Sequence, residues 1–141
     1  MTPLVVDTSV AVAWFISQTY SQQALRILNQ HQAGQWQFLA PDHLYAEFGN
    51  AIWRTNRANL LSAVDAQRII HQFSRETFTL SSTALLLQDA YTLAVQHNRS
   101  VYDCLYIALA QQEKCTFVTA DEKLFNAVNG KLPVTWLANW V

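Results

Sequence analysis

The sequence predicts an α/β protein in which helices cover both faces of a central parallel sheet of about four to five strands. Short apolar runs typical of strands alternate along the chain with longer segments of helical periodicity. Strands that are joined through helices pair in parallel, with right-handed crossovers. We expect one domain over residues 1–141, because the chain contains no linker, repeat or low-complexity segment, and 51% of it is hydrophobic.

The chain begins with a predicted strand at residues 4–6, a β-branched run that stops at Asp7. A helix of small and apolar residues follows and ends near Phe15. A second helix is indicated by Ser21 as its N-cap and by Gly34 as its terminator.

The next predicted strand covers residues 36–40. Pro41 and Asp42 are expected to open a helix that runs to about Arg57, because apolar residues recur there at intervals of three and four. This helix contains Glu47 on its apolar stripe.

Ser62 and Asp65 form a capping box that predicts the start of a further helix. A short strand is expected at 78–80, and the pattern at 83–97 indicates a long helix. Residues 98–100 interrupt the helical pattern.

The last part of the chain continues the alternation of helices and strands. The segment 101–112 is apolar nearly all round, which is typical of a buried helix. A strand at 115–119, a short helix at 121–128 and a last strand at 134–137 complete the predicted elements.

Several kinds of site are excluded in their usual forms. The three glycines lie far apart, so no glycine-rich nucleotide loop can be written, and the four histidines form no HExxH motif. Cys104 and Cys115 make no CxxC pair, which argues against zinc and predicts a reduced, cytoplasmic protein. No apolar run approaches the ~18 residues of a membrane span.

Four carboxylates stand where a charge is unfavourable: Asp7 and Asp121 follow apolar strands, Glu47 lies on an apolar stripe, and Asp103 lies in the first turn of the buried helix. Ligands of open parallel sheets bind at the carboxyl ends of the strands. We therefore expect the four acids to face one crevice. Clustered carboxylates repel one another unless cations compensate, and Mg²⁺ or Mn²⁺ are the cations that oxygen ligands select.

Structural explanations exist for each acid taken alone. Asp103 with Ser100 matches a capping box, while Asp7 and Asp121 are suited to cap the helices that follow them. A salt bridge to an arginine is the alternative for Glu47.

Metal ions held by carboxylates activate water for displacement at phosphorus, so hydrolysis of a phosphodiester is the predicted reaction. Two other aspartate-based α/β chemistries fit poorly. A haloacid-dehalogenase-type phosphatase needs an aspartate where this chain has Ser9, and a receiver domain needs one where it has Ser81 and Ser82.

The residues resemble those of PIN-domain ribonucleases, and within that family the VapC-type toxins of bacterial toxin-antitoxin pairs. The resemblance spans the chain and is carried by four blocks in order: VVDTSV at 5–10, PDHLYAEFGNAIWR at 41–54, YDCLYIALAQ at 102–111 and TADEKL at 119–124. Residues 58–99 carry no family motif and are expected to shape the substrate groove and the partner surface.

The resemblance implies a three-layer α/β/α PIN-like fold and a Mg²⁺- or Mn²⁺-dependent endoribonuclease. By position, Asp7, Glu47, Asp103 and Asp121 would be its catalytic metal ligands. Ser9, Thr119 and Asn50 are candidates to orient these ligands by hydrogen bonds. It also implies an RNA substrate, a small cognate antitoxin and a homodimer. The alternatives are a PIN domain that binds RNA or protein without cutting, and a metal-dependent phosphatase.

Overall fold

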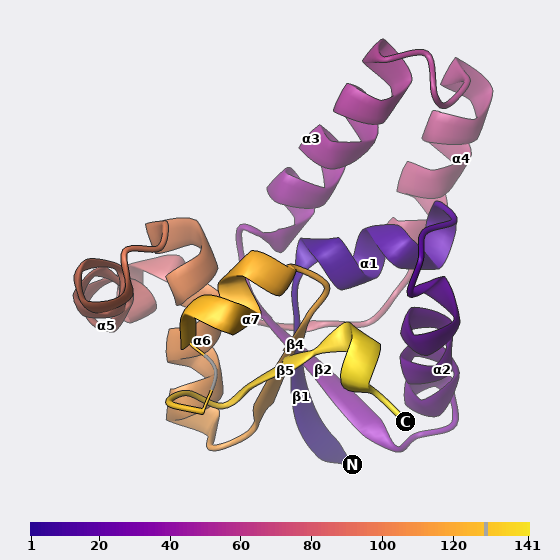
Figure 1. The fold of residues 1–141 in the computed structure, drawn as a ribbon. Coiled ribbons are helices and arrows are strands. Elements are labelled where there is room, and N and C mark those ends of the chain that lie inside the picture. The colour runs from indigo at the N-terminus through magenta and orange to yellow at the C-terminus, as the bar shows by residue number, and fades with distance from the viewer. Residues whose placement is uncertain (129) are drawn as a thin grey trace.

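The computed structural model describes residues 1–128 and 130–141, and it contains one sheet of five parallel strands (Figure 1). The strands are β1 (Thr2–Val6), β2 (Trp36–Pro41), β3 (Thr79–Ser81), β4 (Thr116–Thr119) and β5 (Val134–Trp136). Their order across the sheet is β3-β2-β1-β4-β5. The predicted fold class is confirmed, and each predicted strand is present with its ends shifted by one or two residues at most.

The predicted helices are present as well: α1 (Thr8–Phe15), α2 (Ser21–Gln32), α3 (Leu44–Arg57), α4 (Ala63–Ser74), α5 (Thr83–His97), α6 (Val101–Glu113) and α7 (Glu122–Val128). None of the helices in the described part of the chain is both long and apolar enough to cross a membrane.

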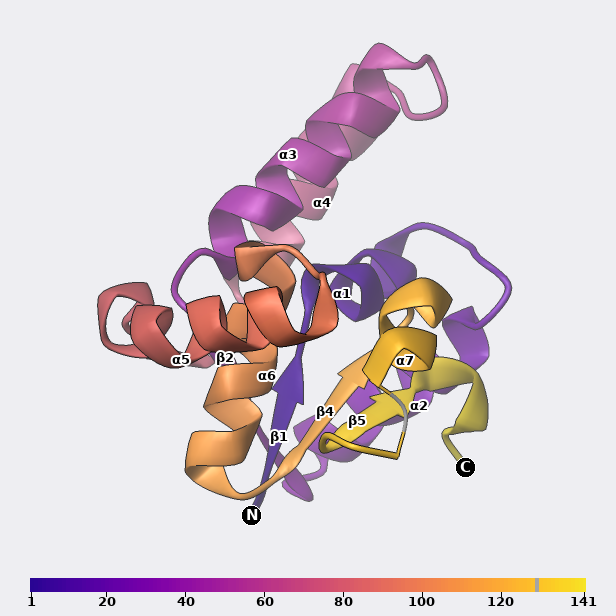
Figure 2. The ribbon, with the colours of Figure 1, turned by 60° about the vertical axis from the view of Figure 1, so that its left-hand side comes forward.

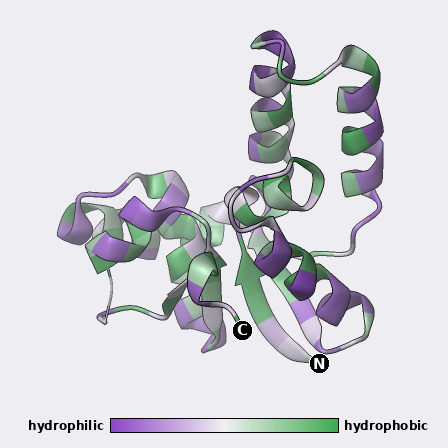
Figure 3. Ribbon diagram, turned by 45° about the vertical axis from the view of Figure 1, so that its right-hand side comes forward, coloured by the Kyte–Doolittle hydropathy of each residue, from purple (hydrophilic) through white to green (hydrophobic). Residues whose placement is uncertain are grey.

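Helices lie on both sides of the sheet and give three layers (Figures 1 and 2). Helices α1 and α2 lie on one side, and α6 packs against β1, β2 and β4 from the other, with α5 outside it. Every residue of α6 from 104 to 110 is buried, which confirms the prediction for this helix. The hairpin of α3 and α4 projects away from the sheet, and hydrophobic and hydrophilic bands alternate around both helices (Figure 3).

Two predicted helix starts are wrong. Ser21 is the first residue of α2 instead of its N-cap, and its Oγ accepts the N–H of Gln18 at 2.8 Å. Pro41 ends β2 instead of opening α3, which begins at Leu44 after His43. A proline, which has no N–H to donate, is tolerated at the end of a strand.

Other predicted boundaries are confirmed. Gly34 follows the C-cap of α2 with a φ of +84°, a conformation that glycine adopts without strain. Ser62 caps α4 by accepting the N–H of Asp65 at 3.1 Å. At the carboxyl end, Leu137 was expected in the last strand but begins a short 3-10 helix (Leu137–Asn139).

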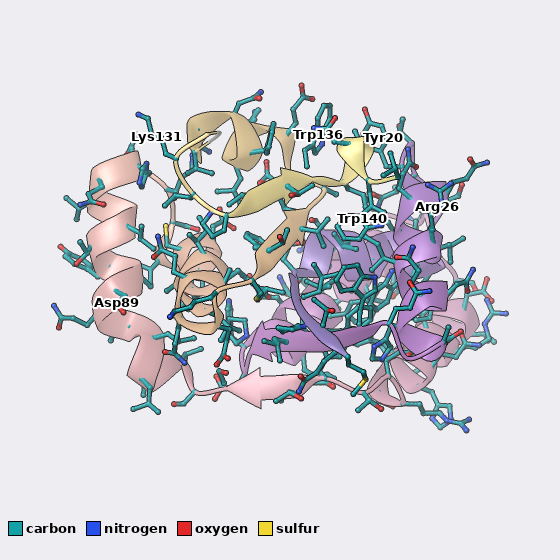
Figure 4. All side chains as sticks on the ribbon, turned by 90° about the horizontal axis from the view of Figure 1, so that it is seen from below. Tyr20, Arg26, Asp89, Lys131, Trp136 and Trp140 are labelled. Atoms are coloured by element: carbon teal, nitrogen blue, oxygen red, sulfur yellow. The ribbon has the colours of Figure 1, made fainter. Side chains whose placement is uncertain are left out.

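The carboxyl-terminal tryptophans serve packing. Trp136 stands edge-on to Tyr20 with ring centroids 5.5 Å apart, and Figure 4 shows the two side by side. Trp140 packs against Trp36 at 5.6 Å. These contacts attach the end of the chain to α2 and β2.

Candidate active site

All four acidic residues line one cleft with a volume of about 740 Å³. Strands β1 and β4 are parallel neighbours with Val6 paired to Val118, so the residues that follow them lie at the same edge of the sheet. This edge brings together the start of α1 after Asp7 and the start of α7 after Asp121. Glu47 and Asp103 enter the cleft from the first turns of α3 and α6.

The carboxylate of Asp7 is the most deeply buried of the four, with 7% exposure. Its Oδ1 accepts a hydrogen bond from Ser9 Oγ at 2.6 Å and another from the N–H of Val10 at 3.3 Å. Its Oδ2 accepts a hydrogen bond from Thr119 Oγ1 at 2.7 Å. Burial raises the pKa of Asp7 to about 7, although these hydrogen bonds act in the opposite direction.

Ser9 and Thr119 also connect Asp7 to the end of β4. Ser9 Oγ accepts the N–H of Ala120 at 2.9 Å, and Thr119 Oγ1 accepts the N–H of Asp121 at 3.1 Å. Each hydroxyl therefore accepts one backbone hydrogen bond and donates one hydrogen bond to the carboxylate of Asp7. The structure thus places both residues where they orient Asp7.

Glu47 is held by a single carboxylate oxygen. Its Oε1 accepts hydrogen bonds from Tyr106 Oη at 2.7 Å and from Thr8 Oγ1 at 3.2 Å. His43 Nε2 lies 3.3 Å from the same oxygen but outside hydrogen-bonding geometry. Within residues 1–128 and 130–141 no arginine lies within ion-pair distance of Glu47, so the salt bridge considered from the sequence is not made.

Asp103 and Asp121 both take part in helix capping. Ser100 Oγ accepts the N–H of Asp103 at 3.1 Å, and Asp121 Oδ1 accepts the N–H of Leu124 at 3.1 Å. Burial is the main cause that raises the pKa of Asp103, and the charges of Asp121 and Glu47 add to it. The capping interpretation is therefore confirmed for Asp7 and Asp121, whereas Asp103 supplies only its backbone N–H to Ser100, the residue that caps α6. The same acids still share one cleft, where Asp103 is repelled by Asp121 and Glu47.

Asn50, the third residue expected to orient the acids, lines the cleft and is exposed. Among the described residues it makes no side-chain hydrogen bond to Glu47. The groups that do contact Glu47 were not identified from the sequence. The i, i+4 spacing of His43 and Glu47 is a signal that one helical turn brings them together, and Tyr106 stands out as a phenol in a buried apolar helix.

The donor chemistry of the cleft suits a hard divalent cation, because its acidic side chains offer carboxylate oxygens. In the described part of the chain, neither oxygen of Asp103 accepts a hydrogen bond, and no lysine or arginine pairs with any of the four acids. A cation would offset the repulsion from Asp121 and Glu47, which adds to the effect of burial on the pKa of Asp103. No three His, Cys, Asp or Glu side chains among the described residues converge on one point. Like charges repel, which is a reason for the carboxylates to stand apart.

Comparison with known proteins agrees with this architecture. The profile of the family described as "PIN domain" matches residues 4–131. The chain is similar to ribonuclease VapC3 of Pyrobaculum aerophilum, with 31% identity over 123 residues that cover 86% of this chain and 91% of that protein.

Two solved structures share the fold. The crystal structure of PAE2754 from Pyrobaculum aerophilum has a TM-score of 0.69 and 20% identity, covering 97% of this chain and 85% of that one. A toxin-antitoxin complex from Klebsiella pneumoniae has a TM-score of 0.63 and 17% identity, covering 94% of this chain and 95% of that one.

Proposed function

This chain belongs to the PIN-domain family, and we propose that it is a metal-dependent endoribonuclease that acts as the toxin of a type II toxin-antitoxin pair. The observation that carries the proposal is the cleft into which four helix starts bring Asp7, Glu47, Asp103 and Asp121. The name of the relative VapC3, a ribonuclease, supports the reaction.

In this proposal the four carboxylates hold Mg²⁺ or Mn²⁺ at the carboxyl edge of the sheet. When bound there, such an ion lowers the pKa of a water molecule and stabilises the charge that develops at phosphorus. Ser9 and Thr119 keep Asp7 in a fixed rotamer through their hydrogen bonds to its two oxygens. The buried setting of Asp7 also excludes water from its carboxylate.

The rim of the cleft provides groups for the RNA backbone. Arg54 and Asn50 of α3 and Gln18 of the α1–α2 connection line the cleft together with the acids. Arg54 supplies a cation that attracts a phosphate, and the two amides supply hydrogen-bond donors. These groups bind RNA without selecting a sequence, so we place substrate choice elsewhere on the surface.

We also propose that a small antitoxin inhibits this protein, that two copies form a homodimer, and that the protein works in the cytoplasm. The fold shared with the toxin-antitoxin complex from Klebsiella pneumoniae supports the first of these. Coexpression with the small protein encoded by a neighbouring reading frame tests it: we expect a stable complex in which RNA cleavage is suppressed.

The decisive experiment measures cleavage of defined RNAs by the purified chain with Mg²⁺ or Mn²⁺. Asp103→Asn and Asp121→Asn are expected to reduce the rate by roughly 100-fold or more, because each removes a charged ligand. Asp89→Asn is the matched control, since Asp89 is an exposed acid on α5 outside the cleft (Figure 4).

Cleavage by the two cleft variants at the rate of the wild type contradicts the proposed site. RNA binding by the wild type without metal-dependent cleavage contradicts the catalytic proposal and favours a PIN domain that only binds. Hydrolysis of small phosphate esters without RNA cleavage favours a phosphatase.

A further inference from the structure

We propose that Tyr106 and Thr8 are positioning residues for Glu47, which they hold by one carboxylate oxygen so that the other oxygen is free for a metal ion in the cleft. This inference rests on the proposed function. It assigns a task to two residues that stand outside the acidic set and outside the hydrogen bonds around Asp7.

The hydrogen bonds to Glu47 are one-sided. Tyr106 Oη and Thr8 Oγ1 both donate to Oε1, at 2.7 and 3.2 Å, and no donor among the described residues reaches Oε2. The side chain of Glu47 is 32% exposed and has several rotatable bonds, so packing alone leaves it many rotamers. Two donors from separate elements restrict these rotamers and keep Oε2 available at the cleft.

Packing does not account for a tyrosine at position 106. The ring is 2% exposed and stacks on Phe117 of β4 with centroids 5.5 Å apart, a contact that phenylalanine makes equally well. A buried hydroxyl is unfavourable unless it is hydrogen-bonded, and the partner of this one is Glu47. The hydrogen bond joins α6 to α3, and Asp103 lies one turn before Tyr106 on α6.

Thr8, the first residue of α1, makes the second restraint. Its neighbours Asp7 and Ser9 are engaged with each other, while the hydroxyl of Thr8 reaches Glu47 on α3. The two residues that follow Asp7 thus donate hydrogen bonds to two different carboxylates, Thr8 to Glu47 and Ser9 to Asp7. The position of Glu47 is thereby fixed relative to Asp7, as Tyr106 fixes it relative to Asp103.

The first test measures the Kd of Mn²⁺ by isothermal titration calorimetry, together with kcat and KM for RNA cleavage. Tyr106→Phe is expected to weaken Mn²⁺ binding roughly 10-fold and to lower kcat while KM for RNA stays unchanged. The matched control is Tyr45→Phe, which removes a hydroxyl from the same helix as Glu47, on a ring that packs against Phe73. It is expected to leave both quantities unchanged.

The second test asks whether Tyr106 acts through Glu47. In a Glu47→Ala background, Tyr106→Phe is expected to cause no further loss of Mn²⁺ affinity. Thr8→Val should weaken Mn²⁺ binding in the same direction as Tyr106→Phe, and Thr8→Ser, which keeps the hydroxyl, should restore it. If Tyr106→Phe does not fold, Thr8→Val still tests the inference, because it removes the other hydrogen bond to Oε1 of Glu47.

The outcomes separate this inference from the proposed function. Wild-type protein that binds no Mn²⁺ overturns both. Mn²⁺ binding that is weakened in Glu47→Ala but unchanged in Tyr106→Phe and Thr8→Val overturns the inference alone. An equal loss from Tyr106→Phe in the presence and absence of Glu47 also overturns it, because the tyrosine then acts through the general structure.

Discussion

Replacing Asp7 by asparagine is expected to stabilise the metal-free protein at high pH. The pKa of Asp7 is raised from 3.8 to about 7 by burial, so the folded state holds its proton more tightly than the unfolded state does. The stabilisation from the protonated carboxyl is complete below the unfolded-state pKa of 3.8 and is lost as the pH rises to about 7. The wild-type protein therefore loses stability over this range, whereas asparagine does not titrate.

The size of the effect follows from the shift. A rise from 3.8 to about 7 corresponds to about 4 kcal/mol in total, of which about 2 to 3 kcal/mol falls between pH 5 and pH 8. Asparagine places an N–H₂ group where Oδ2 accepts from Thr119, and losing that hydrogen bond costs about 1 kcal/mol at every pH. At pH 8 in the absence of divalent cations, we expect Asp7→Asn to be the more stable protein.

Urea unfolding followed by tryptophan fluorescence, at pH 5 and pH 8 with a chelator present, measures this difference. Asp89→Asn is the control for the loss of an exposed acid outside the cleft. A difference between Asp7→Asn and wild type that is the same at both pH values refutes the reasoning. Added Mn²⁺ should raise the stability of the wild type and leave that of Asp7→Asn nearly unchanged. An equal gain in stability in both proteins contradicts the assignment of Asp7 as a metal ligand.

Three further changes test the surroundings of the cleft. Ser9→Ala removes a hydrogen-bond donor to Asp7 and the acceptor of the Ala120 N–H. Urea unfolding should show that the free energy of unfolding falls by about 1 to 3 kcal/mol, and NMR titration should show a higher pKa of Asp7. Phe48→Ala removes a ring that is stacked on Phe73 with ring centroids 3.7 Å apart. In the same assay it should lower the free energy of unfolding by about 3 to 5 kcal/mol. Arg54→Ala should weaken binding of single-stranded RNA and lower the salt dependence of the affinity by about one phosphate contact, as measured by fluorescence anisotropy.

The fold could be predicted because each element carries its own local signal. The alternation of strand and helix patterns, the cap at Ser62 and the wholly apolar stretch of α6 all act within a few residues of sequence. The errors occur where two local signals compete. Pro41 is compatible both with the first turn of a helix and with the end of a strand. In the folded protein it pairs with Ser81 of β3 and therefore belongs to strand β2.

The acids of the site could be predicted from the same kind of information, whereas the partners of Glu47 could not. Asp7 and Asp121 follow strands, and the rule on the carboxyl ends of parallel strands brings them together. The contact between Tyr106 and Glu47 joins residues 59 positions apart on two different helices. Its existence depends on how α3 and α6 pack, which no local pattern in the sequence records.

Helix capping and the proposed metal binding are compatible explanations for the acids of the cleft. Asp7 and Asp121 accept hydrogen bonds from the N–H groups of the helices they begin, and Asp103 and Glu47 lie in first turns. The positive end of each helix dipole offsets part of the repulsion among the carboxylates. Asp121 uses one oxygen to cap its helix, and no donor among the described residues engages its other oxygen. Helix starts at one edge of a parallel sheet are thus a way to gather negative charge without unfolding the protein.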